Sequence, residues 1–106
     1  MSNKTMPLND FYNLHKSLKK DEVILDVRRP DEFQAGHIEN ARNIPVDQVA
    51  GFVDDLRKYS TIYIHCKRGG RAKTAFEILS NAGLSNLVCI NDAGMDQWME
   101  SGYPVV

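Results

Sequence analysis

The stretch TIYIHCKRGGRAKTAFEILSNAG, residues 61–83, decides the fold class of this chain. Residues 61–65 are β-branched or aromatic up to a closing histidine, which predicts a buried strand. Two adjacent glycines at positions 69 and 70 predict a tight loop after it. From about residue 71 to residue 82, alanine, phenylalanine and leucine recur at helical spacing until Gly83 ends the pattern. A strand, a tight loop and a helix in this order are typical of a parallel α/β fold.

The same alternation continues along the rest of the chain. The strands expected from apolar runs cover residues 23–27, 41–44 and 87–90. Apolar spacing predicts helices over 8–20 and 46–57, and a last helix whose buried face holds Met95, Trp98 and Met99. A short helical turn is expected from Pro30 to Gly36. Because strands alternate with helices, the sequence predicts one mostly parallel sheet with helices on both faces.

Length and composition limit what the chain can be. Its 106 residues and 12.0 kDa predict one domain over 1–106, with the core over about 8–106. The net charge of -1 lacks the basic excess of a general nucleic-acid binder. The longest apolar run, Leu87 to Ile90, is far shorter than the ~20 residues of a membrane span, so no membrane partner is expected. Two cysteines form no disulfide framework, which favours a cytoplasmic domain with reduced thiols.

Reactive side chains follow several of the expected strands. Cys66 comes directly after one strand, Asp26 and Arg28 close another, and Asp92 follows a third. In an open parallel sheet, sites form beyond the carboxyl ends of the strands. We therefore expect these side chains to share one edge of the sheet.

The segment CKRGGR, residues 66–71, is expected to carry the chemistry. Gly69 and Gly70 let successive backbone N–H groups turn inward into an anion-binding nest, and the helix that starts near Arg71 adds the positive end of its dipole. Four cations and no acid lie between residues 66 and 73, namely Lys67, Arg68, Arg71 and Lys73. This environment is expected to favour the thiolate form of Cys66 and to hold an anion against its sulfur.

A cysteine nucleophile in an anion cradle suits a thiosulfate-like sulfur donor, a phosphate ester or arsenate. Loop length separates these substrates. Cysteine phosphatases use Cys-x5-Arg, which is one residue longer than the spacing from Cys66 to Arg71, and the extra residue widens the cradle for a tetrahedral phosphoryl group. The shorter loop favours a smaller guest, the outer sulfur of a persulfide.

The sequence resembles the single-domain rhodaneses (thiosulfate sulfurtransferases) in motifs that occur in the right order. CKRGGR is similar to the active loop of that family, Cys-x-x-Gly-x-Arg. The other similar motifs are LDVRRPDEF at 25–33, GHI at 36–38 and ARNIP at 41–45 near the N-terminus, and GMDQW at 94–98 and GYPV at 102–105 near the C-terminus. The resemblance covers about residues 8–106.

The resemblance implies an α/β fold, a single rhodanese-like domain with a mostly parallel five-stranded sheet flanked by helices on both faces. It implies that Cys66 attacks the sulfane sulfur of thiosulfate, releases sulfite, and passes sulfur from its persulfide to a thiol or cyanide acceptor. It also implies that the backbone N–H groups of residues 67–71 stabilise the persulfide, that Arg71 orients and neutralises the loop, and that Lys67 and Arg68 attract the anionic donor. No cofactor beyond the covalent persulfide is implied.

Residues near the loop are expected to support it. Asp26 and Arg28 are expected to anchor the loop, or to pair with each other or with Glu32. His65 is expected to be a packed, supporting residue, since side chains alternate along a strand and it faces away from the reactive cysteine. Cys89 is expected to be an inert core thiol. The spacing of histidines and cysteines suits no metal ion.

Two other functions stay open. A non-enzymatic persulfide carrier or docking module would hand sulfur to a protein partner and turn over thiosulfate slowly, and the small size of the chain favours it. A small cysteine phosphatase or arsenate reductase would need the longer loop and an aspartic general acid, which Asp92 could supply.

Overall fold

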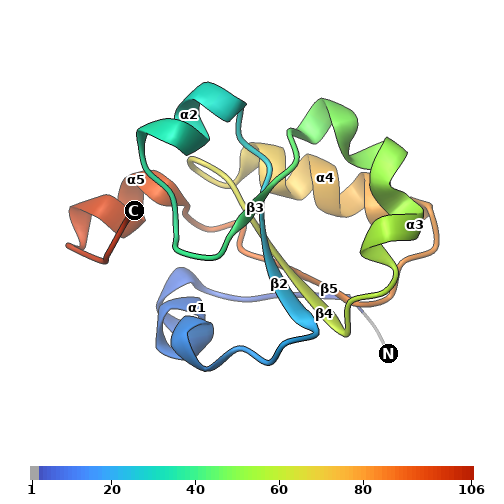
Figure 1. Ribbon diagram of the computed structural model, residues 1–106, viewed down its shortest axis with the longest axis horizontal. Coiled ribbons are helices and arrows are strands. Elements are labelled where there is room, and N and C mark those ends of the chain that lie inside the picture. Colours follow the sequence, from blue (N-terminus) through green and yellow to red (C-terminus); the bar gives the residue numbers. More distant parts are fainter. Residues whose placement is uncertain (1–2) are drawn as a thin grey trace.

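Five parallel strands form one sheet at the centre of the structure, a computed structural model that describes residues 3–106 (Figure 1). The strands are β1 (Lys4–Thr5), β2 (Glu22–Asp26), β3 (Arg42–Asn43), β4 (Thr61–His65) and β5 (Leu87–Cys89), in the order β1-β5-β4-β2-β3. The middle strand, β4, pairs with β2 along its whole length and with β5 along part of it. Since every pair is parallel, the carboxyl ends of the strands share one edge of the sheet.

Helices cover both faces of the sheet, as the sequence predicts. One face packs against η2, a 3-10 helix (Val46–Phe52), α3 (Val53–Leu56) and α4 (Gly70–Asn81). The other packs against α1 (Leu8–Leu14), which η1 (His15–Ser17) extends, and against α5 (Met95–Glu100). Figure 1 shows α3 and α4 above the strands and α1 below them, with α2 (Pro30–Ala35) and α5 at the side where the loop after β4 emerges. The expected fold, a single α/β domain with a five-stranded parallel sheet, is confirmed.

Side chains of β4 alternate between the two cores. Ile62, Ile64 and, just beyond the strand, Cys66 lie in the core under α4. Tyr63 lies in the other core, where its ring centroid is 5.7 Å from that of Phe11 in α1. Burying one isoleucine contributes about 1.5–3 kcal/mol, so a register slip that reversed the two faces would be strongly disfavoured. The packing of β4 thus determines that the Cys66 side chain points toward α4.

Two helices are less regular than the sequence predicts. The helix expected over 8–20 is α-helical only to Leu14, and η1 ends it at Ser17. The Ser17 hydroxyl donates to the Leu14 carbonyl at 3.0 Å and so occupies an acceptor that a continuing helix would use. The helix expected over 46–57 is mostly the 3-10 helix η2, which contains Gly51, a residue that weakens an α-helix.

The two ends of the chain also differ from the prediction. The fifth strand, β1, lies at the edge of the sheet, and no apolar run marks it because it is only two residues long. The Asn3 side chain helps to hold it, since its Oδ1 accepts a hydrogen bond from the Leu87 N–H at 2.9 Å. In α5, Met95 and Trp98 are buried as expected, but Met99 is 48% exposed. The Trp98 ring is the part of α5 that packs against Phe11 of α1, with 5.9 Å between the ring centroids.

Candidate active site

Cys66 lies at the bottom of the loop that joins β4 to α4. Its Sγ atom accepts two backbone hydrogen bonds, from the Gly69 N–H at 3.1 Å and from the Ala72 N–H at 3.3 Å. The residue is only 1% exposed. Backbone N–H groups aimed at one atom form a site of partial positive charge, which stabilises a negatively charged sulfur. The resemblance to the rhodaneses implies such groups over residues 67–71. In the structure, one of the two donors is Gly69, from that range, and the other is Ala72, from the first turn of α4.

The two loop glycines have different roles. Gly69 has a φ of +113°, in the left-handed region that L side chains rarely adopt. A Cβ atom there would also collide with the carbonyl oxygen of Asn91, in the segment that follows β5. Gly70 begins α4 and has open space where a Cβ atom would lie. The chain therefore needs glycine at position 69 to turn its N–H toward the sulfur, and does not need it at position 70.

The start of α5 holds the first half of the loop. The Met95 N–H donates to the Cys66 carbonyl at 2.8 Å, and the Asp96 N–H donates to the Lys67 carbonyl at 3.1 Å. These bonds need a close approach at Gly94, where a Cβ atom would collide with the backbone of both loop residues. Because the first two loop carbonyls face α5, the backbone that follows can present its N–H groups to the sulfur.

Two carboxylates neutralise two of the cations that the sequence places near the sulfur. Arg71 forms a two-bond ion pair with Glu32 of α2, with N–O distances of 2.5 and 3.0 Å. Arg68 forms an ion pair with Asp96, with its Nε atom 2.9 Å from Oδ2. Hydrogen bonding to the Arg71 guanidinium lowers the pKa of Glu32 to about 2, and the pKa of Arg71 is raised in turn. Of the four cations that the sequence places between residues 66 and 73, two are therefore paired with carboxylates from other parts of the chain.

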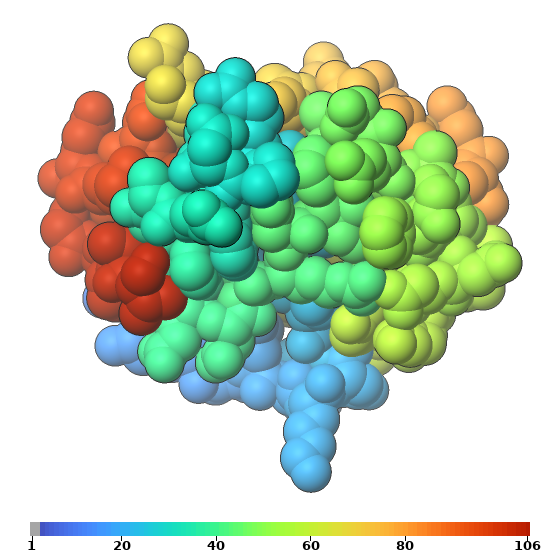
Figure 2. All heavy atoms as spheres, turned by 45° about the horizontal axis from the view of Figure 1, so that its top comes forward, coloured from blue at the N-terminus to red at the C-terminus, as the bar shows by residue number. Residues whose placement is uncertain are grey.

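The remaining loop cations lie outward. Lys67 and Lys73 are exposed, and neither forms an ion pair within residues 3–106. Figure 2 shows the loop after β4 standing out from the surface beside α2 and α5. The two neutralising carboxylates escaped the sequence analysis because they are distant in sequence: Glu32 lies 39 positions from Arg71, and Asp96 lies 28 positions from Arg68. No local spacing links these pairs.

Asp26 and Arg28 pair with each other, one of the arrangements that the sequence leaves open. Both are buried, and the Arg28 Nη2 atom lies 2.8 Å from Asp26 Oδ2 and donates to the Gly36 carbonyl at 2.7 Å. The Asn43 side chain donates to the backbone carbonyls of both residues. This network joins the end of β2 to the turn after α2, and so it supports the element that carries Glu32.

His65 faces away from Cys66, as strand alternation predicts. Its ring lies 6.2 Å from the Phe11 ring, in the core under α1. The side chain is 1% exposed, and its Nε2 atom has no hydrogen-bond partner in the described residues and lies 3.9 Å from Asp26 Oδ2. Burial lowers the pKa of His65, because a charged imidazole would lose its hydration. These observations support a neutral His65 side chain that is packed in the core.

Cys89 and Asp92 lie at the end of the neighbouring strand. Cys89 is fully buried in β5, and burial, with the nearby Cys66 as a smaller cause, raises the pKa of its thiol to about 12. It is therefore protonated at neutral pH, in agreement with an inert core thiol. Asp92 is exposed and forms no ion pair with any described residue.

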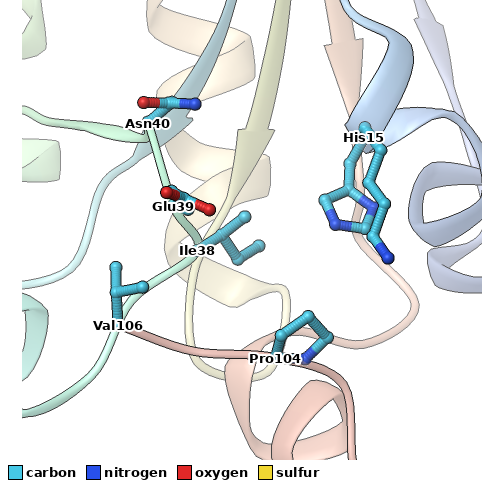
Figure 3. Close-up of a pocket in the computed structure, with 7 residues that line it drawn as sticks. His15, Ile38, Glu39, Asn40, Pro104 and Val106 are labelled. Atoms are coloured by element: carbon cyan, nitrogen blue, oxygen red, sulfur yellow. The ribbon is translucent and has the colours of Figure 1, made fainter.

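One hollow on the surface lies away from Cys66. It is a pocket of about 220 Å³ between η1 and the turn after α2, in which His15 lies across from Ile38 and Val106 (Figure 3). No residue of the loop 66–71 lines it. Within residues 3–106, no three His, Cys, Asp or Glu side chains are grouped so that they could hold a metal ion. In the same residues, no helix is long and apolar enough to cross a membrane.

The structure thus places a cysteine sulfur that accepts hydrogen bonds from two backbone N–H groups at the carboxyl edge of a parallel α/β sheet. The sequence matches the family described as the rhodanese-like domain over residues 10–101. The chain therefore belongs to the rhodanese-like family, as the sequence motifs predict.

Relatives agree with this assignment. The chain is 30% identical over 101 residues to the thiosulfate sulfurtransferase GlpE of Pseudomonas putida, an alignment that covers 95% of this chain and 88% of GlpE. It is 32% identical over 75 residues to the uncharacterized protein YqhL of Bacillus subtilis, covering 71% of this chain and 59% of YqhL. A crystal structure of a rhodanese-related protein from Thermoplasma volcanium superposes with a TM-score of 0.82, at 35% identity and with 97% of each chain covered.

Proposed function

We propose that this chain is a sulfurtransferase and that Cys66 is its catalytic residue. The observation that carries the proposal is the pair of backbone N–H groups, from Gly69 and Ala72, that meet on Cys66 Sγ. Membership of the rhodanese-like family and the likeness to GlpE support sulfur transfer at the level of the family. The substrates of such a reaction are a sulfur donor and a sulfur acceptor.

In the proposed reaction, the Cys66 thiolate attacks the outer sulfur of the donor. With thiosulfate, the new Cys66 S–S bond forms as the bond between the two thiosulfate sulfurs breaks, and sulfite leaves with that electron pair. The outer sulfur of the Cys66 persulfide is then attacked by a thiol or by cyanide, which regenerates the thiolate. The N–H groups that meet the sulfur stabilise negative charge at each stage, and the scheme needs no metal or other cofactor.

The test combines a turnover assay with protein mass. Incubation with thiosulfate and cyanide should yield thiocyanate, and thiosulfate alone should add about 32 Da, one sulfur atom, to the protein in this covalent scheme. Cys66→Ser should lose both signals. Cys89→Ser is the matched control, since that thiol is buried and protonated, and it should keep the sulfur adduct. An adduct that persists in Cys66→Ser would contradict the proposal.

One observation keeps the persulfide carrier as a second candidate. Cys66 is only 1% exposed, which suits delivery by a docked protein partner as well as by a small donor. A carrier would load sulfur from a protein persulfide and turn over thiosulfate with cyanide only slowly. Comparing the two donors in the same assay separates the two functions.

A further inference from the structure

The ion pair between Arg68 and Asp96 lies on the outer side of the loop. The Arg68 side chain is 75% exposed and that of Asp96 is 22% exposed. Arg68 directly precedes Gly69, whose N–H contacts the Cys66 sulfur. A donor that approaches the loop from solvent therefore meets this pair.

The backbone of Asp96 is bonded to the loop, whereas the Arg68 side chain is mostly exposed. The backbone N–H of Asp96 donates to the Lys67 carbonyl, which keeps residue 96 next to the loop. Arg71 is already paired with Glu32. Among the described residues, Lys67 is thus the one cation of the loop without a carboxylate beside it.

The charges at the entrance to the loop affect a donor with two negative charges more than a donor with one. Thiosulfate is a dianion, and a dianion gains or loses twice as much electrostatic free energy from each charge at the entrance as a monoanion does. A small alkyl persulfide carries one negative charge on its sulfur, or none when it is protonated. A loop whose arginines are both neutralised favours the donor of lower charge.

We propose that Asp96 is a specificity-determining residue, which neutralises Arg68 at the entrance and so favours small persulfides over thiosulfate as the sulfur donor. The inference rests on the proposed function of Cys66. In the step it favours, the Cys66 thiolate attacks the outer sulfur of R–S–SH, a new S–S bond forms on Cys66 as the S–S bond of the donor breaks, and R–S⁻ leaves with that electron pair. The persulfide proton passes to solvent, so no oxidant or reductant is required.

Two variants that break the same ion pair test the proposal, because they change the charge in opposite directions. Asp96→Asn frees Arg68 and should lower the KM for thiosulfate by roughly three- to tenfold, the effect in water of one unit charge several ångströms from a dianion. Arg68→Gln leaves Asp96 unopposed and should raise that KM by a similar factor. The KM for cysteine persulfide, a monoanion, should move by only the square root of each factor. The exposed Glu100 at the far end of α5 gives the control Glu100→Gln, which should change neither KM.

Wild-type protein should also show a higher kcat/KM with cysteine persulfide than with thiosulfate, and added salt should shrink the differences between variants. The proposal is overturned if both variants move the thiosulfate KM in the same direction, if both donors respond equally, or if Glu100→Gln has as large an effect. These results leave the role of Cys66 intact. If instead Cys66 gains no sulfur from either donor, the proposed function fails and this inference fails with it.

Discussion

The ion pair between Glu32 and Arg71 should contribute measurably to stability, with a defined dependence on pH. The pKa of Glu32 is about 2 in the folded protein against an ordinary value of 4.5. A difference of this size corresponds to about 3 kcal/mol at neutral pH. The Glu32 side chain is 18% exposed and that of Arg71 is 32% exposed, so solvent screening reduces the figure to about 1.5–3 kcal/mol.

The sign follows from the lowered pKa. Because folding favours the ionised carboxylate, the contribution is complete above pH 4.5 and is lost as the pH falls toward 2. By the same relation, roughly three-fifths of it remains at pH 3.5. Glu32→Gln removes the charge at every pH, so the difference between wild type and variant should follow this curve.

Urea denaturation at pH 7 and at pH 3.5 measures the effect. We expect Glu32→Gln to lower the free energy of unfolding by about 1.5–3 kcal/mol at pH 7 and by clearly less at pH 3.5. Asp31→Asn is the matched control, because Asp31 is an exposed neighbour that pairs only with the exposed Arg29. The reasoning would be refuted if Glu32→Gln lowered the free energy of unfolding equally at both pH values, or if Asp31→Asn lowered it as much as Glu32→Gln does.

Three further predictions concern the glycines of the site and the buried histidine. Gly69→Ala should lower the free energy of unfolding by about 1–3 kcal/mol and abolish thiocyanate formation, because the new Cβ atom would sit on a residue with positive φ and collide with the Asn91 carbonyl. Gly70→Ala should leave the stability and the thiocyanate formation near wild type. Gly94→Ala should reduce kcat more than it changes KM, because the collision displaces the backbone that bears the nucleophile. The free energy of unfolding of the wild type should fall as the pH drops below 6.5, because His65 is protonated in the unfolded chain but not in the folded one. In urea titrations at pH 7 and pH 5.5, His65→Phe should show a smaller difference between the two pH values than the wild type does.

The parts of the fold that the sequence predicts well are those in which one local pattern and the tertiary packing agree. The strand 61–65 and the helix after it are found almost as expected, since β-branched residues, paired glycines and a helical apolar stripe all indicate the same elements. The helix over 8–20 fails at its end because the Ser17 side chain competes for a backbone carbonyl. The strand β1 escapes detection because its stability comes from pairing with β5, and two residues carry no period.

The residues of the candidate site also fall into two groups, those that a local pattern predicts and those that only the fold brings together. The cysteine that follows the strand and the glycines that predict a tight loop are local properties of CKRGGR, so the sequence indicates them. The charge on the loop is a property of the folded chain. It depends on Glu32 and Asp96, and only the fold brings these carboxylates to Arg71 and Arg68.

Two of the motifs that resemble the family hold the loop that contains Cys66. The motif at 25–33 supplies Glu32, which holds the loop from the α2 side. The motif at 94–98 supplies the glycine that permits close approach and two N–H groups that bind the loop carbonyls from the α5 side. The loop thus takes its shape from contacts with two elements, α2 and α5. A loop held in this way keeps its N–H groups aimed at the sulfur without the need to reorganise during a reaction. For this reason the motifs together indicate this loop conformation more strongly than the loop motif alone, because two of the other motifs supply residues that hold the loop.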